Sequence, residues 1–193
     1  MESAAESDED LMRKFGRGDG AAFEILYRRH ESRVFRYLYR HVGNHASAND
    51  LMQEVWFAVA RSAERYQPTA KFTTWLFTMA HHRMVDSLRK ARRQLSLDAV
   101  DPEEDEDFSL ANRLAADPRA EPPAELSSQD EAAALLQAVS ALPLEQRTAF
   151  LMQAEGELSL ADIAQATDSN VETVKSRLRY ARAKLRQLLW EYA

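Results

Sequence analysis

The segment between residues 94 and 131 constrains the fold more than any other part of this chain. It holds twelve acidic residues against two basic ones, and prolines interrupt it. Mutual repulsion of the carboxylates and a shortage of apolar side chains leave little to offset the entropy lost on ordering. We expect a flexible linker here, so the 193 residues should divide into two small folded units.

Both flanking segments show apolar residues at spacings of three and four, which is the pattern of amphipathic helices. No run alternates apolar and polar residues between turn signals, so no sheet is expected. In the first unit the pattern predicts one long helix or two stacked helices over about 22–42, and another over about 47–65. A third helix should start at a cap on Thr73 or Thr74 and end in the basic run 89–93.

The second unit carries the sequence signals of a helix-turn-helix. Pro143 suits the first turn of a helix. A capping box begins at Ser159 and opens a short helix, and residues 167–170 turn the chain. A second box at Ser169, or Asn170 beside it, opens a longer helix. In such a unit the second helix lies in a DNA major groove.

The predicted fold class is therefore all-α, with two small helical domains over 20–93 and 132–193 joined by the flexible acidic linker. The overall net charge of −6 conceals an uneven distribution. It is −3 in an acidic tail over 1–19, +7 in the first domain, −10 over 94–131 and zero in the second domain. Two segments able to face a polyanion thus flank an acidic one.

The last helix has six basic residues and no acidic one between Lys175 and Arg186. Its apolar stripe starts at Val174, and helical periodicity then leaves four side chains for base edges: Glu172, Lys175, Ser176 and Arg179. Three further side chains are placed to reach phosphates: Arg177, Arg182 and Lys184. The alternative is a solvated basic helix with no function, and the turn that precedes the helix favours DNA reading.

Aromatic and basic residues alternate in the first domain around the start of its third helix. Such a surface can stack unpaired bases and follow a nucleic-acid backbone. The residues concerned are Tyr66, Phe72, Trp75 and Phe77 with Lys71, Arg83, Arg89, Lys90, Arg92 and Arg93. The alternative is a plain core role, which we favour for Phe77 and leave open for Phe72 and Trp75.

Several function classes are excluded by what the chain lacks. Without cysteine there is no disulfide framework, iron–sulfur cluster or thiolate zinc site. His41 with His45, and the pair His81–His82, lack a third ligand at regular spacing, so no metal is expected. No phosphate loop or nucleophile elbow is present, and we expect neither a cofactor nor an enzyme. No signal peptide or spanning segment is seen, which predicts a cytoplasmic protein.

The ordered motifs resemble those of sigma factors of the sigma-70 family. The motifs are 50–54 (DLMQE), 72–76 (FTTWL), 86–89 (DSLR), 141–143 (ALP), 160–164 (LADIA) and 173–178 (TVKSRL). The resemblance covers about 20–93 and 132–190, and the two-domain brevity points to the extracytoplasmic-function class. It implies a subunit that binds core RNA polymerase, through its beta-prime and beta subunits, and directs it to promoter DNA. The two domains would then correspond to sigma regions 2 and 4.

What the resemblance implies for individual residues follows from the matching motifs. The helix with Asp50, Leu51, Gln53 and Glu54 would dock on the clamp coiled coil of beta-prime. The minus-ten element would be bound by Lys71, Phe72, Thr74, Trp75, His82, Arg83 and Arg89. The minus-35 element would be bound by Glu172, Thr173, Lys175, Ser176, Arg177, Arg179 and Arg182. The linker would lie in the RNA exit path.

Four positions depart from the family pattern: Asn49, His82, Asp168 and Tyr180. Asn49 replaces an acid and weakens the negative docking patch, and phosphorylation near that helix, at Ser47 or Ser62, could restore the charge, so a regulatory kinase is considered as a partner. The resemblance separately implies an anti-sigma factor as a partner, since many members of the family are held by one. Asp168 replaces a turn glycine, which aspartate tolerates because it adopts left-handed backbone angles more readily than most residues. Two alternatives stay open: a stand-alone helix-turn-helix regulator that dimerises through its first domain, and a hydrolase that uses Asp50, Glu54 and the histidines.

Overall fold

The computed structural model describes residues 6–98 and 128–190, and this part of the chain contains helices and no strand. The all-α prediction is confirmed. Residues 1–5, 99–127 and 191–193 lie outside the described residues, and so does most of the expected linker. None of the described helices is long and apolar enough to cross a membrane.

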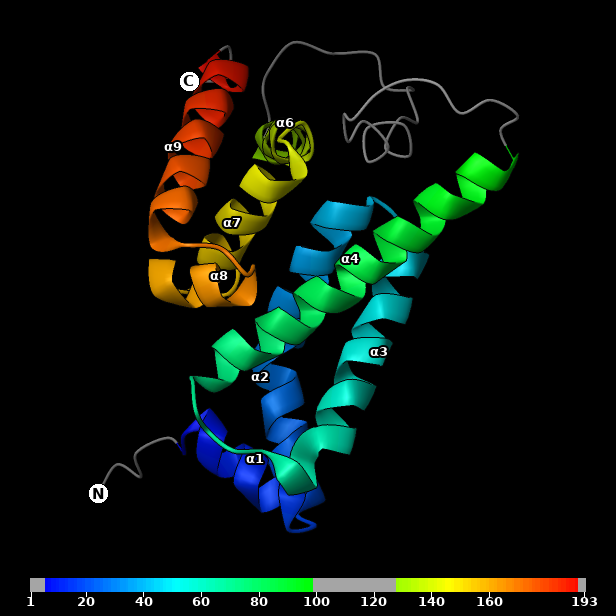
Figure 1. Ribbon diagram of the computed structural model, residues 1–193, viewed down its shortest axis with the longest axis vertical. Helices are drawn as coiled ribbons and strands as arrows, with labels where there is room; N and C mark the ends of the chain where they lie inside the picture. Colours follow the sequence, from blue (N-terminus) through cyan, green and yellow to red (C-terminus); the bar gives the residue numbers. More distant parts are fainter. Residues whose placement is uncertain (1–5, 99–127, 191–193) are drawn as a thin grey trace.

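The first domain is built on three long helices: α2 (Gly20–Val42), α3 (His45–Ser62) and α4 (Phe72–Asp98). Helix α2 is continuous, so of the two arrangements predicted for about 22–42 the one long helix is confirmed. It ends because Gly43 adopts a left-handed φ of 67°. Asn44 then caps α3 by accepting a hydrogen bond from the Ser47 N–H, and the short 3₁₀ helix η1 (Ala63–Arg65) follows. Figure 1 shows α4 crossing α2 and α3.

The segment expected to be an acidic tail contains a further helix, α1 (Asp8–Gly16). Ser7 caps it by accepting a hydrogen bond from the Asp10 N–H at 3.1 Å. Leu11 and Met12 are 1% and 0% exposed, because α1 packs on α2 and η1. The sequence signal was present, since a Ser cap precedes acidic residues and apolar residues at helical spacing.

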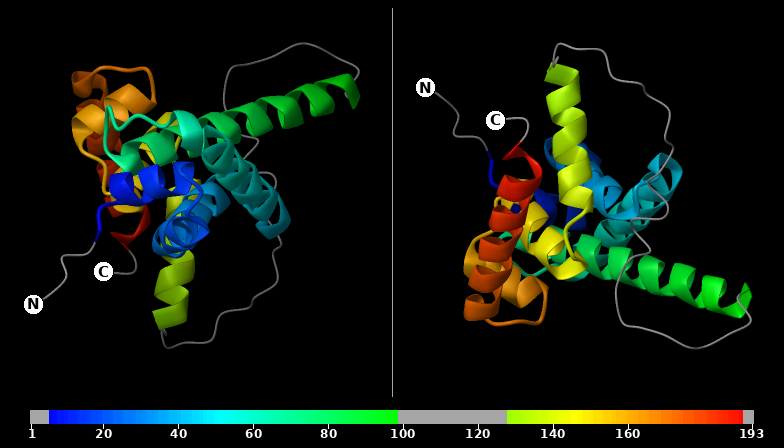
Figure 2. Two further views of the ribbon diagram at one scale, coloured as in Figure 1. Left: turned by 90° about the horizontal axis from the view of Figure 1, so that it is seen from below. Right: turned by 90° about the horizontal axis from the view of Figure 1, so that it is seen from above.

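Helix α4 differs from its predicted bounds at both ends. It starts at Phe72, so the expected cap at Thr73 or Thr74 is wrong and both threonines lie inside the first turn. It continues to Asp98, beyond the basic run 89–93 where its end was expected. The far end of α4 therefore extends past the body of the molecule (Figure 2).

The second domain consists of α6 (Ser128–Ser140), α7 (Leu144–Ala154), α8 (Leu160–Ala166) and α9 (Val171–Leu188). The capping box of Ser159 and Asp162 is confirmed, and Asn170 rather than Ser169 caps α9. Asp168 has a φ of 46°, as the substitution for glycine in the turn requires. Pro143 occupies the position just before α7 rather than its first turn. The helix-turn-helix of α8 and α9 is thus present.

The two domains pack directly on each other in this structure. Helix α7 lies against α2, and α8 lies against α4. Gly156 lies close to the first domain, because a Cβ there would lie 3.3 Å from Cγ of Phe77 in α4. One cluster of buried apolar side chains consequently runs from the first domain into the second.

Buried polar groups join the same interface. His41 of α2 is 1% exposed, and its Nδ1 donates to the Tyr37 carbonyl oxygen at 2.8 Å. Its Nε2 must then accept from the Thr148 hydroxyl of α7, 3.1 Å away. Burial, with a smaller contribution from the nearby Arg147 guanidinium, lowers the pKa of His41 to about 3. The docked domains therefore require this histidine to be neutral.

We expect the protein to lose stability as the pH falls from about 6.5 toward the folded-state pKa of His41. The unfolded chain takes up a proton on this side chain near pH 6.5, whereas the folded protein does so only near pH 3. The free energy of unfolding should therefore be lower at pH 5 than above pH 6.5, by about 2 kcal/mol from this group. Denaturant titrations at pH 7.5 and pH 5 measure the difference.

His41→Gln is the matched variant for this measurement, because a carboxamide can both donate and accept hydrogen bonds but does not titrate. Its unfolding free energy should change less between the two pH values. Burial also lowers the pKa of His81, to about 4, so part of the dependence will persist. An equal fall of the unfolding free energy in the variant and in the native protein would contradict the assignment of this pH dependence to His41.

Candidate functional site

The outer face of α3 presents three of the four side chains predicted to dock on a protein partner. Asp50, Gln53 and Glu54 are exposed. Leu51 is 5% exposed and belongs to the core, so its predicted direct contact is corrected to a packing role. Its position on the buried stripe follows from the spacing to Val55, one helical turn later.

An exposed aromatic residue on the same face was missed by the sequence analysis. Phe57 is 66% exposed, three residues after Glu54. With Arg61 and with Arg83 of α4, these two side chains line a shallow groove. Phe57 lies off the buried stripe, which was the available signal. Aromatic residues are enriched in protein–protein interfaces, so Phe57 is a candidate contact for a protein partner.

Asn49, one of the departures from the family pattern, lies next to this face. The Asn49 amide nitrogen lies 2.9 Å from Nδ1 of His45, on the first turns of α3. Of the two serines considered for phosphorylation, Ser47 is exposed. The Ser62 hydroxyl is part-buried and donates to the Ala58 carbonyl oxygen at 2.8 Å. Ser47 is therefore the more accessible of the two.

The start of α4 carries an aromatic cluster that combines core and surface. The ring centroid of Trp75 lies 5.1 Å from that of Tyr66 and 5.8 Å from that of Phe72. Tyr66 and Trp75 are half-buried, whereas Phe72 is fully buried. Phe77 is also fully buried, as favoured from the sequence. Trp75 is thus left as the ring of α4 that can stack on a base.

Two of the predicted minus-ten residues do not offer a free side chain here. Phe72 is 0% exposed, so a direct contact with DNA is corrected to support of the Trp75 ring. Thr74 is 2% exposed and its hydroxyl donates to Asp162 of α8 at 2.9 Å. The other predicted residues are exposed or part-exposed: Lys71 just before α4, and Trp75, His82, Arg83 and Arg89 along it.

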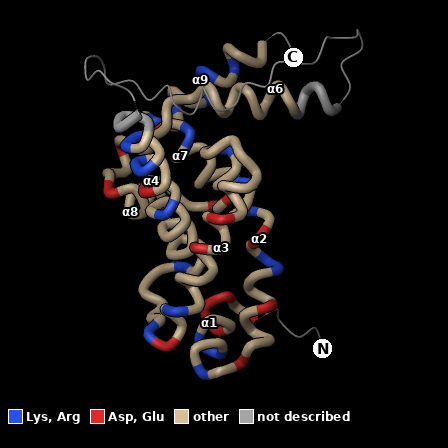
Figure 3. The backbone as a smooth tube through the Cα atoms, turned by 90° about the vertical axis from the view of Figure 1, so that its right-hand side faces the viewer, with Lys and Arg blue, Asp and Glu red and all other residues tan. Residues whose placement is uncertain are grey.

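Helix α9 presents its basic side chains as the periodicity predicted, with Val174, Leu178, Ala181 and Leu185 buried. Figure 3 shows Lys and Arg recurring along α9. Four residues of the predicted set are exposed: Glu172, Lys175, Arg179 and Arg182. Three are part-exposed: Thr173, Ser176 and Arg177.

Several of these side chains have partners within the protein. Lys175 pairs with Glu172 at 2.7 Å on the exposed face. Arg177 pairs with Glu145 of α7 at 2.6 Å, and its side chain is only 20% exposed. The Arg179 guanidinium lies 5.0 Å from the ring centroid of Tyr180, which stands where the family usually has a basic residue. An exposed ion pair exchanges readily for a phosphate or base, since such pairs contribute little in water.

A groove lies between the start of α9 and the start of α7, and one residue of α4 reaches it. This open groove of about 850 Å³ has Thr173, Ser176 and Arg177 on one side and Arg92 of α4 on another. Burial lowers the pKa of His81 in α4, and the negative charge of Asp168, in the turn before α9, opposes this by raising it.

Family models match both domains. A model of sigma-70 region 2 matches residues 26–94, and one of sigma-70 region 4 matches residues 132–185. The chain is 30% identical over 183 residues to the ECF RNA polymerase sigma factor SigM of Mycobacterium tuberculosis (strain ATCC 25618 / H37Rv). The matched segment covers 95% of this chain and 85% of that relative. This chain belongs to the extracytoplasmic-function (ECF) class of sigma factors.

Further similarities agree with this assignment. The sigma factor is 28% identical over 173 residues to the ECF RNA polymerase sigma factor SigW of Bacillus subtilis (strain 168), covering 90% of this chain and 91% of that one. Its fold is similar to that of the sigma factor RpoE of Bartonella quintana, solved with the anti-sigma factor NepR. The TM-score is 0.62 at 24% identity, over 81% of this chain and 89% of that one.

The family assignment decides between the functions left open by the sequence. As a sigma factor, the protein directs transcription initiation by RNA polymerase. The match to both region 2 and region 4 favours this function over a stand-alone regulator and over a hydrolase. Among the residues that the structure describes, no three His, Asp or Glu side chains gather as a metal site would require.

Proposed function

We propose that the first domain, over about 20–93, binds core RNA polymerase and the minus-ten element, and that the second domain, over about 132–193, binds the minus-35 element. The observation that carries this proposal is the helix α9. It follows a capped helix and a left-handed turn, and it presents Lys175 and Arg179 to solvent. A helix so placed has the geometry of a major-groove reader.

The polymerase-docking surface in this proposal consists of Asp50, Gln53, Glu54 and the newly recognised Phe57. All four are exposed on α3, and they combine negative charge, an amide and an apolar ring. Such a mixture suits a protein partner with basic residues around an apolar centre. Leu51 supports this surface from the core.

The minus-ten surface in this proposal runs along α4. Trp75 would stack on an unpaired base, while Lys71, His82, Arg83 and Arg89 would follow the backbone. Phe72 and Thr74 hold the first turn in place. Because Thr74 is bonded to Asp162 of α8, the second domain must leave α4 before DNA can reach this turn.

We expect Lys175→Ala and Arg179→Ala to weaken minus-35 recognition. A side chain that bonds a base edge contributes about 1–3 kcal/mol of discrimination. The affinity for the preferred duplex should therefore fall, and the preference at one or two base positions should relax. A selection from random duplexes, with the native sigma factor in parallel, measures both.

Arg182→Ala provides the matched control for these variants, since Arg182 is predicted to contact a phosphate. It bonds Gln153 at 2.7 Å in this structure. Its affinity should fall about equally for all duplexes, with a weaker salt dependence. An unchanged base preference in both Lys175→Ala and Arg179→Ala would refute the assignment of the reading face.

The remaining parts of the proposal concern partners and setting. We propose that the protein acts in the cytoplasm, where core polymerase and promoter DNA are found, and that it catalyses no reaction of its own. An anti-sigma factor is a proposed partner, since the RpoE structure of similar fold contains one. A kinase acting at Ser47 is the alternative route of control, because a phosphate there would add negative charge beside the docking surface.

A further inference from the structure

Helix α1 touches the chain at both ends of the loop over residues 66–71, which joins η1 to α4. Before the loop, Gly16 packs on the backbone of Ala63 so closely that a Cβ at Gly16 would clash with the Ala63 carbonyl oxygen. After the loop, a carboxylate oxygen of Glu9 accepts a hydrogen bond from the Phe72 N–H at 2.7 Å. The spacing of Glu9 and Gly16 along one rigid helix therefore fixes the two ends of the loop.

The Glu9 contact supplies a cap that the local sequence of α4 does not encode. The first N–H groups of a helix have no partner within the helix, and a side chain just before it usually satisfies one. Here the preceding residues are Ala70 and Lys71, neither of which has an acceptor in its side chain. A carboxylate at this end also interacts favourably with the helix dipole.

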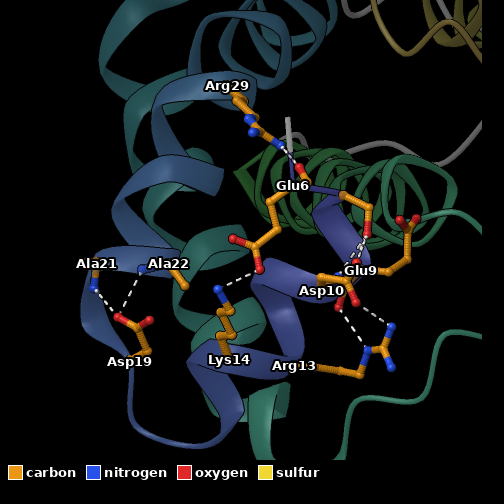
Figure 4. A network of polar contacts seen from close by, with 10 residues as sticks. Glu6, Glu9, Asp10, Arg13, Lys14, Asp19, Ala21, Ala22 and Arg29 are labelled. Carbon is orange, nitrogen blue, oxygen red and sulfur yellow. Dashed lines mark hydrogen bonds and ion pairs between the residues drawn. The ribbon is translucent and has the colours of Figure 1, made fainter. Parts of the chain in front are cut away.

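Helix α1 is itself held firmly enough to act in this way. Asp8 accepts a hydrogen bond from Arg29 of α2 at 2.7 Å and lies 2.7 Å from Nε2 of His30. Burial would raise the pKa of Asp8, but the hydrogen bonds from His30 and Arg29 lower it. Figure 4 shows the adjoining contacts, in which Glu6 accepts from Lys14 and from Arg29.

We propose that α1 is a brace for the loop over 66–71, and that Glu9 is a positioning residue for capture of the unpaired minus-ten strand. The inference rests on the proposed function of Trp75 and its neighbours. Glu9 holds the Phe72 backbone, and the Phe72 ring packs against both Tyr66 and Trp75. Loss of the cap frees the first turn of α4 and with it the orientation of the Trp75 ring.

The first arm of the test measures amide hydrogen exchange in the full chain without DNA. Glu9→Ala should speed exchange at the amides of residues 72–75 by about tenfold, while amides in the middle of α4 keep their native rates. Glu9→Gln retains an acceptor oxygen and should exchange much as the native protein does. Glu24→Ala is the matched control, since Glu24 pairs with Arg28 on the exposed face of α2.

The second arm uses the complex of the sigma factor with core polymerase. The native complex is first used to select two probes from random pools. One is a single-stranded oligonucleotide for the minus-ten site, and the other is a duplex for the minus-35 site. Glu9→Ala should bind the single strand about five to ten times more weakly and the duplex equally well. Glu9→Gln should restore most of the single-strand affinity.

Two results would contradict the proposal that α1 fixes the loop: unchanged amide exchange at residues 72–75 in Glu9→Ala, or an equal loss of affinity for both probes. Equal loss would mean that the substitution destabilises the whole protein. Failure of the native complex to select either probe would instead contradict the proposed function. The exchange experiment would then still decide whether Glu9 fixes the start of α4.

Discussion

Glu54→Lys should abolish the binding of this sigma factor to core RNA polymerase while leaving its fold intact. Glu54 is exposed on α3 beside Asp50 and Phe57, so the substitution reverses the charge at the centre of the docking surface without disturbing the core. Juxtaposing like charges in an interface costs several kcal/mol. We expect a loss of affinity of about a hundredfold or more.

The measurement is co-elution of the sigma factor with purified core polymerase on size exclusion, at several protein concentrations. Glu24→Lys is the matched control, because it makes the same charge change at an exposed position of α2. Circular dichroism and the thermal midpoint check that both variants fold. Normal complex formation by Glu54→Lys would contradict the docking surface.

Glu155→Ala should separate the two domains. The Glu155 carboxylate is 7% exposed and accepts hydrogen bonds from Arg36 at 2.9 Å and from Arg40 at 2.6 Å. Its carbonyl oxygen accepts another from Arg33, at 2.6 Å. Removing one member of a buried ion pair costs about 3–5 kcal/mol. The arginines can partly turn to water here, so we expect about 2–3 kcal/mol, or a shift of about fiftyfold toward separated domains.

The distance between two labels reports this separation directly. The chain contains no cysteine, so Glu64→Cys and Gln187→Cys introduce two unique exposed sites, one in each domain. Energy transfer between dyes at these sites should fall in Glu155→Ala. Glu157→Ala is the matched control, since Glu157 is 78% exposed and pairs with Arg33 at 2.9 Å. Equal energy transfer in the labelled native protein, Glu155→Ala and Glu157→Ala would show that Glu155 does not hold the domains together.

The same separation bears on function, because in the closed arrangement the second domain covers part of the proposed minus-ten surface. The Thr74 hydroxyl is bonded to Asp162, and Arg92 of α4 lines the groove beside Thr173, Ser176 and Arg177 of α9. If the domains must part before promoter DNA is engaged, Glu155→Ala should bind minus-35 duplex more tightly than the native protein in the absence of polymerase. The gain is limited to the free energy of opening.

The sequence alone determined the all-α class, the two units and the helix-turn-helix, because these depend on signals a few residues apart. The capping box of Ser159 and Asp162, the left-handed Asp168 and the buried stripe that begins at Val174 all lie within single helices or turns. Short-range periodicity and backbone preference specify such features wherever the rest of the chain lies.

Only the tertiary structure decided which side chains are free to act. Leu51, Phe72 and Thr74 lie within matching motifs yet are buried by residues from other helices. The cap on α4 comes from Glu9, 63 positions away, and the ion pair between the domains joins Arg36 to Glu155, 119 positions apart. Contacts across such separations leave no local pattern, since they depend on how whole helices pack.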